Sequence, residues 1–389
     1  MPTPEELDQI TLDDLRTTGT TKWNRPDQAL GAFVAEMDFG VAQPIKDALH
    51  SEVDKGLFAY LPEHYRERMQ TSVSDLLARK FDWHVETSHI HEMPDVVACY
   101  QAAIQHFSAP GSKIIVPTPA YMPFLAVAGM EGREVIEVPM RASDEPWQFE
   151  NDLEAISAAF DDGGNLLVLC NPHNPTGRVF TLEELKAIEE LVDKKDGRVF
   201  VDEIWMPLVY EPHKHIPYAS IGKRAANHSV TATAASKGFN LPGLKCAQLI
   251  LTNDADQTKW NDVGFLFMHG AANLGLVATS AAFDSAEDWL NDIIDYLQGN
   301  RDALIAFVEE KLPKARVTCP EGTYVAWIDL TKYAIDDVQS FLLEKAGVMC
   351  TDGTACGAVG NGHIRFIFAM PRPIMLTALE KIAQALSDV

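Results

Sequence analysis

The sequence predicts an α/β fold in which a large domain with a mostly parallel sheet is followed by a smaller C-terminal α/β domain. From Asp95 onward, near-continuous apolar runs of strand length alternate with helical patterns, which is typical of parallel strands covered by helices on both faces. After residue 285 one long helical stretch appears, and the alternation then repeats on a smaller scale. The 389 residues exceed what one small core needs and suit two domains.

Residues 1–40 are expected to form an irregular arm. The next segment, Val41–Lys55, has the signature of a helix, with Pro44 in its first turn and Gly56 just after its end. Apolar residues at helical spacing predict a second helix at Arg66–Phe81. The elements that follow are, in order, a helix at Val96–Phe107, strands at Lys113–Val116, Glu134–Val138 and Asn165–Cys170, a helix from the capping box Thr181–Glu184 to Val192, and strands at Arg198–Asp202, Ser229–Thr233 and Cys246–Leu251.

The C-terminal part is predicted to form the smaller domain, and a long helix at Ala286–Lys311 is expected to bridge the two domains. We expect an N-terminal arm at 1–45 that packs on the smaller domain, a large domain at 46–285 and a small domain at 286–389. The elements after the bridging helix are strands at Arg316–Cys319 and Thr323–Leu330, a helix at Asp336–Lys345, a strand at His363–Phe368 and a helix at Arg372–Leu386.

The composition argues against several classes of function. The formal net charge of −24 disfavours nucleic-acid binding, because neutralising phosphates needs a basic face. No apolar run reaches the length of a bilayer span, and the acidic start lacks the apolar core of an export signal. The six cysteines are scattered without metal-ligand spacing. Reduced, mostly buried thiols in a cytoplasmic protein without a membrane partner or a metal are therefore expected.

One lysine stands out in the stretch Thr231–Lys245. Lys237 follows a β-branched strand and lies between Ser236 and Gly238. Because Gly238 and the later Pro242–Gly243 pair interrupt regular structure, we expect Lys237 to project from a loop. Small and apolar neighbours would remove its hydration, lower the pKa of its amine and make it nucleophilic, as Schiff-base formation with pyridoxal 5'-phosphate (PLP) requires. A solvated lysine in a turn is the alternative.

Two further polar positions follow buried strands. The loop Asn171–Arg178, NPHNPTGR, lies where open α/β sheets bind ligands, and Asn174 can donate its amide to a ring oxygen. A tight strand-to-helix turn is the alternative. Asp202 ends the next apolar strand, where a carboxylate is costly unless it pairs with a cation. A protonated pyridine nitrogen is a suitable partner, since the pair keeps the ring able to accept electrons; a helix or turn cap is the alternative.

Asn174, Asp202 and Lys237, each at a strand end and in this order, resemble the PLP set of the aspartate-aminotransferase fold, also called fold type I. The resemblance runs from about residue 33 nearly to the end of the chain. It is closest to the cystathionine β-lyase or C–S lyase branch, related to class I and II aminotransferases, through KWN, FVAEMDF, PTPAYMPF, NPHNPTGR, SKGFNLPGLK, EGTYVAWIDL and HIRFIFAMPRP. It implies a PLP-binding large domain with a sheet of the seven-stranded type, and a homodimer with shared active sites.

The resemblance also implies roles for residues outside this set. Tyr121 would stack on the pyridine ring, restrain its tilt and take part in catalysis. Arg365 would clamp the substrate α-carboxylate with its planar, two-pronged donor. Tyr60 would reach the phosphate of the neighbouring subunit's cofactor and, with Asn174, contact the substrate. The alternatives are a core tyrosine, a surface ion pair and an exposed loop tyrosine, respectively. Trp205 stands where many aminotransferases have a tyrosine that bonds the ring oxygen, which leaves that role to Asn174.

The implied phosphate site consists of the backbone N–H groups of Val96 and Val97 at a helix start, with side-chain contacts from Ser236 and Lys245. Two residues there depart from the family pattern. Asp95 stands where glycine is usual, and an acid is unfavourable at that place unless it points away from the phosphate. Lys245 replaces a common arginine, so it offers a point charge in place of a bidentate fork.

The reaction that the resemblance implies is a β-elimination on an amino-acid substrate. Lys237 would hold PLP as a Schiff base, be displaced by the substrate amine and then act as general base on the Cα proton. Asp202 would keep the ring nitrogen protonated while the Cβ–S bond of L-cystathionine or another S-substituted cysteine breaks. The products would be a thiol (homocysteine from cystathionine), pyruvate and ammonia. Two alternatives stay open: a class I/II aminotransferase acting on a small amino acid, and a PLP-fold regulatory protein with a protein partner.

Overall fold

The main sheet has seven strands. A computed structural model describes residues 2–25, 27–144, 146–387 and 389. The strands are β2 (Ile90–Met93), β3 (Lys113–Thr118), β4 (Val135–Pro139), β7 (Gly164–Cys170), β8 (Arg198–Asp202), β9 (Ser229–Thr233) and β10 (Ala247–Ile250). In space they follow the order β2-β10-β9-β8-β7-β3-β4, with β10 antiparallel to both neighbours and the strands from β9 to β4 parallel. The predicted mostly parallel sheet is confirmed.

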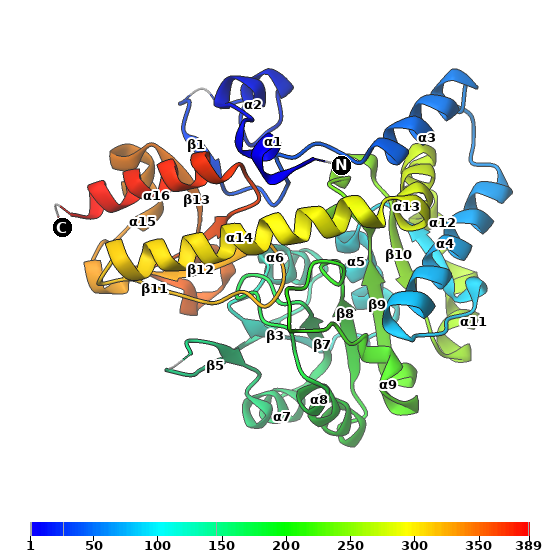
Figure 1. The fold of residues 1–389 in the computed structure, drawn as a ribbon. Helices are drawn as coiled ribbons and strands as arrows, with labels where there is room; N and C mark the ends of the chain where they lie inside the picture. Colours follow the sequence, from blue (N-terminus) through cyan, green and yellow to red (C-terminus); the bar gives the residue numbers. More distant parts are fainter. Residues whose placement is uncertain (1, 26, 145, 388) are drawn as a thin grey trace.

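The main sheet is covered on both faces (Figure 1). Neighbouring residues of a strand point to opposite faces, and in β8 Phe200 packs into one apolar cluster while Val199 and Val201 pack into another. This double burial explains the near-continuous apolar strands. The first cluster includes α4 (Glu63–Phe81), α5 (Val96–His106) and α13 (Asn273–Ser285), and the second includes α7 (Leu153–Asp161) and α8 (Leu182–Lys194). Further helices of this part are α3 (Gln43–Asp54), α6 (Met122–Met130), α9 (Lys223–His228), α10 (Ala235–Gly238), α11 (Asp254–Val263) and α12 (Phe265–Met268).

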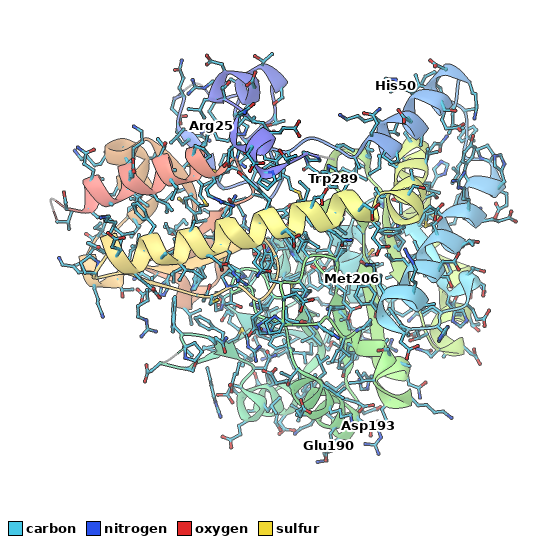
Figure 2. The ribbon with its side chains drawn as sticks, in the orientation of Figure 1. Arg25, His50, Glu190, Asp193, Met206 and Trp289 are labelled. Carbon is cyan, nitrogen blue, oxygen red and sulfur yellow. The ribbon has the colours of Figure 1, made fainter. Side chains whose placement is uncertain are left out.

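Helix α8 forms as the sequence predicts. The Thr181 hydroxyl accepts the Glu184 N–H at 3.3 Å, and the Glu184 carboxylate accepts the Thr181 N–H at 2.7 Å, which satisfies two donors at the helix start. One face is apolar and buried, and the other meets solvent at the outer edge of the molecule (Figure 2). The buried face consists of Leu185, Ile188 and Val192, and the outer face carries Glu190 and Asp193.

A second sheet of five strands forms the smaller part of the molecule. In spatial order its strands are β1 (Leu30–Ala32), β13 (Val348–Asp352), β14 (His363–Ile367), β12 (Val325–Asp329) and β11 (Arg316–Val317). β1 pairs in parallel with β13, and the other neighbours are antiparallel. A separate ribbon joins β5 (Arg141–Ala142) to β6 (Phe149–Glu150), and α15 (Val338–Phe341) and α16 (Arg372–Leu386) are the remaining C-terminal α-helices among the described residues.

The long helix α14 (Glu287–Lys311) runs across the molecule from α13 to the smaller sheet and α16 (Figure 1). Its first residues pack in the core beside the helices of the main sheet, and its last turns contact β11. None of the helices in the described part of the chain combines the length and the apolar character that crossing a lipid bilayer requires. The limits 1–45, 46–285 and 286–389 stay predictions for the arm and the two domains.

The N-terminal arm is more regular than expected. Within the predicted irregular segment 1–40, α1 (Pro4–Asp8) and α2 (Leu12–Thr18) are helices that each begin with a capping box, and β1 belongs to the smaller sheet. That expectation is therefore wrong for these segments. The two helices are too short for apolar periodicity to reveal them, and β1 is defined by its pairing with β13 and not by its own sequence.

The expectation that Lys237 projects from a loop is also wrong. Ala235–Gly238 forms a single helical turn, α10, directly after β9. Gly238 does not prevent this turn because the helix ends there. A side chain at position 238 would approach the Pro207 Cβ to 3.2 Å, so the glycine allows close packing at this point.

Candidate active site

The largest cavity among those described lies at the carboxyl ends of the central parallel strands, where open α/β sheets bind ligands. Its volume is about 590 Å³. The loop after β7, the end of β8 and the turn after β9 form its floor, while residues 33–36 and β14 close it from the smaller sheet. Nine of the ten predicted site residues line this one cavity: Val96, Val97, Tyr121, Asn174, Asp202, Ser236, Lys237, Lys245 and Arg365.

Asp202 is the last residue of β8, and its side chain is buried, with 3% of the residue exposed. Its Oδ1 accepts the Ile204 N–H at 3.0 Å, which is the one side-chain hydrogen bond it makes within the described residues. Burial raises the pKa of the Asp202 carboxyl to about 7, while the Ile204 N–H and the charge of Lys237 act against this rise. A cationic ring nitrogen placed beside Asp202 would therefore gain a strong partner.

Lys237 lies on α10 and directs its amine into the same cavity. Its Nζ donates to the Ala35 carbonyl at 2.8 Å and lies 5.4 Å from the centre of the Trp205 ring. Burial, and then the positive charge of Arg365, lower the pKa of the Lys237 amine to about 8, although the charges of Asp202 and Glu36 oppose this change. The amine is therefore neutral far more often near physiological pH than an exposed lysine would be.

Arg365 extends from β14 and is 3% exposed. Its Nη2 donates to the Phe33 carbonyl at 2.9 Å, and its Nη1 donates to Asn174 Oδ1 at 3.4 Å. Its Nε is buried and has no hydrogen-bond partner among the described residues. Burial lowers the pKa of the Arg365 guanidinium. A buried guanidinium with unused donors suits a ligand carboxylate, which it can hold with two bonds.

The predicted phosphate site lies at the start of α5, where Val96 and Val97 carry backbone N–H groups that the helix leaves without partners. Asp95 precedes them as the N-cap: its Oδ1 accepts the Ala98 N–H at 2.9 Å, and its Oδ2 pairs with Lys245 Nζ at 3.0 Å. The acid that departs from the family pattern thus caps the helix and is neutralised by the lysine. Lys245 therefore pairs with Asp95 and at the same time lines the cavity.

The two predicted tyrosines are placed differently. Tyr121 precedes α6, contacts Phe124 edge to face at 5.5 Å between ring centres, and presents its ring to the cavity. Burial raises the pKa of its hydroxyl. Tyr60 is 86% exposed, stacks on His269 and does not line the cavity of its own chain. Trp205 is buried on the cavity wall and contacts Tyr324 edge to face.

Residues 33–36, which we call the strap, have a role in the site that was not predicted from the sequence. Its carbonyl groups accept hydrogen bonds from Lys237 and Arg365, and the Tyr324 hydroxyl also donates to Ala35 at 3.0 Å. The strap is one wall of the cavity. In the sequence, the motif FVAEMDF marks this segment only through its resemblance to the lyase branch. Its polar contacts are made by the backbone, so no side chain of the strap could have revealed them.

A buried ion pair anchors the strap. Lys22 Nζ lies 2.8 Å from Asp38 Oδ2, and the Trp23 indole N–H donates to Asp38 Oδ1 at 2.8 Å. On the other side, Asn240 exchanges two hydrogen bonds of 2.9 Å with the Met37 backbone. The KWN and FVAEMDF motifs therefore form one unit that fixes the strap beside the turn that carries Lys237.

Four features thus face one cavity. They are a lysine whose amine has a lowered pKa, a buried carboxyl group, a guanidinium with an unused donor, and the N–H groups at the start of α5. Comparisons identify the class of protein that this arrangement defines: the class I and II aminotransferase family matches residues 34–382, and the chain belongs to this family. It is 36% identical over 377 residues to a cystathionine beta-lyase of Corynebacterium glutamicum, covering 96% of this chain and 99% of that protein.

Two solved structures have the same fold over nearly their whole length. A putative PLP-dependent beta-cystathionase of Corynebacterium diphtheriae matches with a TM-score of 0.91 and 34% identity, covering 97% of this chain and 98% of that one. The PLP-bound C-S lyase of Staphylococcus hominis matches with a TM-score of 0.89 and 26% identity, covering 98% and 99%. The predicted resemblance to the lyase branch of this fold is confirmed.

Proposed function

We propose that the protein is a PLP-dependent carbon–sulfur lyase that cleaves the Cβ–S bond of L-cystathionine or related S-substituted cysteines. With water, the reaction gives a thiol (homocysteine from cystathionine), pyruvate and ammonia. The observation that carries the proposal is the convergence of Lys237, Asp202 and Arg365 on one cavity, in a chain that is 36% identical to a cystathionine beta-lyase.

The residues of the cavity fit PLP. Asp202 is buried with room for a cationic partner, Tyr121 offers an aromatic face, and the start of α5 suits a phosphate. Ser236 and Lys245 would add side-chain contacts to that phosphate, and Lys237 would hold the cofactor through its amine. When bound, PLP supplies an electron sink for the pair of electrons left at Cα.

Each residue then has a defined task on the substrate. Arg365 binds the α-carboxylate and, with Asn174, fixes the direction in which the Cα–H bond points. Lys237, whose amine has a pKa of about 8, removes the Cα proton, because a base that titrates near the working pH is both available and strong enough. Asp202 holds positive charge at the ring nitrogen, and the strap shields the site from water.

The proposed assembly is a homodimer in the cytoplasm. Three large, mainly apolar side chains in or beside α12 are strongly exposed, and His269 stacks on two of them, Tyr60 and Phe265. Such an apolar patch supports an interface with a second copy, in which Tyr60 reaches the partner's phosphate site. The patch consists of Tyr60, Phe265 and Leu266, exposed to 86%, 67% and 80%.

The test incubates PLP-loaded protein with L-cystathionine alone and, separately, with an amino acid plus 2-oxoglutarate. We expect pyruvate and free thiol in equal amounts from cystathionine, and no glutamate that depends on the oxo acid. The matched variant Lys237→Ala should lose both products and the visible absorbance that PLP acquires on joining the lysine. Glutamate formation without pyruvate would identify an aminotransferase instead, and a wild-type protein that stays colourless with PLP would overturn the proposal.

A further inference from the structure

Glu36 is an acid in the cavity wall that the proposed reaction does not use. The described residues of the lining include three acids: Asp95, Asp202 and Glu36. Asp95 is paired with Lys245, and Asp202 faces the floor. Glu36 forms no ion pair of 4.0 Å or less with any described lysine, arginine or histidine, and its Oε1 is buried without a hydrogen-bond partner. A carboxylate oxygen left without a partner in a buried place is costly unless a ligand completes it.

Glu36 lies on the wall of the cavity that the strap forms, and not on the floor at the strand ends. This position favours a contact with the substrate over a contact with the cofactor. Glu36 belongs to the strap, whose Phe33 carbonyl accepts from Arg365 and whose Ala35 carbonyl accepts from Lys237. Its charge acts on the Lys237 amine, so it lies within electrostatic reach of the reacting centre. Asp38, which pairs with Lys22, lies two residues beyond Glu36, and this pair restrains the backbone of the segment.

We propose that Glu36 binds the ammonium group carried by the leaving-thiol half of the substrate, and so selects L-cystathionine among S-substituted cysteines. This inference rests on the proposed lyase function. Arg365 takes the carboxylate of the reacting half, and the amine of that half is consumed in joining the cofactor. The cation that remains on cystathionine is the distal ammonium, and a carboxylate with free lone pairs is its natural acceptor.

The test uses two substrates that differ by this ammonium alone: L-cystathionine and S-(3-carboxypropyl)-L-cysteine. Pyruvate release gives kcat/KM for each with the wild type and with Glu36→Gln, which keeps the shape and removes the charge. We expect Glu36→Gln to lower kcat/KM for cystathionine by about 10- to 100-fold and to change it for the analogue by less than about twofold. Glu36→Asp should restore part of the preference.

Glu190→Gln is the matched control, because it removes one charge from an exposed carboxylate that pairs with Lys194 on the outer face of α8. It should leave both substrates unaffected. An equal fall for both substrates in Glu36→Gln would mean that Glu36 acts on the chemistry through Lys237. Unchanged kcat/KM for both substrates would mean that Glu36 contacts neither of them. Each result overturns the inference while the lyase function stands. No pyruvate from either substrate with the wild type would overturn the lyase function and the inference together.

Discussion

Burial shifts the pKa of three charged side chains in the cavity: Asp202, Lys237 and Arg365. It raises the pKa of Asp202 to about 7, lowers that of Lys237 to about 8, and also lowers that of Arg365. The acid and the amine therefore titrate close together, near the pH at which an acid–base catalyst is most effective. Such shifts are typical of functional sites, because the protein keeps charges in a place that disfavours them.

The burial of Asp202 predicts a cost to stability in the ligand-free protein. Its folded pKa of about 7 exceeds the usual 3.8, so the stability that the protonated group contributes is present at low pH and is lost as the pH rises through 7. Asp202→Asn keeps an acceptor for the Ile204 N–H and removes the charge. We expect this variant to be more stable than the wild type near pH 8, by on the order of 1–4 kcal/mol.

Thermal unfolding of ligand-free protein measures this difference. The advantage of Asp202→Asn should shrink as the pH is lowered toward about 5, since the wild-type carboxyl then becomes protonated in the folded state. The same variant should lose lyase activity at every pH. A variant that melts below the wild type near pH 8 would show that the carboxylate is stabilised by its surroundings.

The lowered pKa of Lys237 predicts how fast ligand-free protein captures PLP. Only the neutral amine attacks the aldehyde, so the rate should rise with pH and level off above about 8. The rate with an ordinary lysine would continue to rise up to its usual pKa of 10.5. Stopped-flow absorbance between about pH 6 and pH 10 follows the reaction. A rate that still climbs steeply above about pH 9 would contradict the buried environment of the amine.

Arg365→Ala separates substrate binding from cofactor binding. The guanidinium touches Phe33 and Asn174 and makes no contact with Asp202 or Lys237 within hydrogen-bond distance. We expect the visible absorbance with PLP to persist, while kcat/KM for cystathionine falls by about 100-fold or more because a bidentate carboxylate contact is lost. Loss of the absorbance in this variant would show that Arg365 belongs to the cofactor site.

At the scale of elements, the strap depends on the buried pair Lys22–Asp38. The side chains of both residues are nearly inaccessible, at 0% and 3% exposure. Removing one partner leaves the other charge buried and alone, so Lys22→Met should lower the free energy of unfolding by about 3–5 kcal/mol. The double variant Lys22→Met with Asp38→Asn should recover part of this loss, because no isolated charge remains.

Denaturant unfolding of the two variants tests this prediction. Lys194→Met is the control: it breaks the pair with Glu190, whose two side chains are 67% and 61% exposed, and should cost less than about 1 kcal/mol. A loss in Lys22→Met no larger than in Lys194→Met would show that the buried pair does not hold the strap.

Parts of this site could be predicted because polar residues at the ends of apolar strands are conspicuous. Asp202 ends such a strand, Asn174 and Lys237 come shortly after one, and parallel strands bring their carboxyl ends to one edge. The strap could not be found in this way, since its contacts run through backbone carbonyls. Helix α13 was missed for a different reason: nine consecutive residues, Gly275–Phe283, are buried, so no polar face gives the helix a period.

At the scale of the whole molecule, Tyr60 is the one predicted site residue that its own chain leaves outside the cavity. If it serves the partner's site in the proposed homodimer, two inactive variants should complement each other. In a hybrid of Lys237→Ala with Tyr60→Ala, one of the two sites combines an intact Lys237 with an intact Tyr60. A random mixture, in which half the dimers are hybrids, should regain about a quarter of the wild-type activity.

The measurement unfolds and refolds the two variants together and assays pyruvate against each variant treated alone. Mixing without refolding is the control, since stable dimers should then exchange few subunits. No recovery after refolding would place Tyr60 in the site of its own chain, or outside the reaction.

The cavity is closed by segments from opposite ends of the chain: the strap at 33–36 and Arg365 on β14. During synthesis on the ribosome, the main sheet with Asp202 and Lys237 emerges well before β14 does. A chain that ends before β14 contains Lys237 but lacks Arg365, which helps to lower the pKa of the Lys237 amine and is proposed to bind the substrate carboxylate. Both the environment of the amine and the proposed carboxylate site therefore depend on a strand that leaves the ribosome near the end of translation.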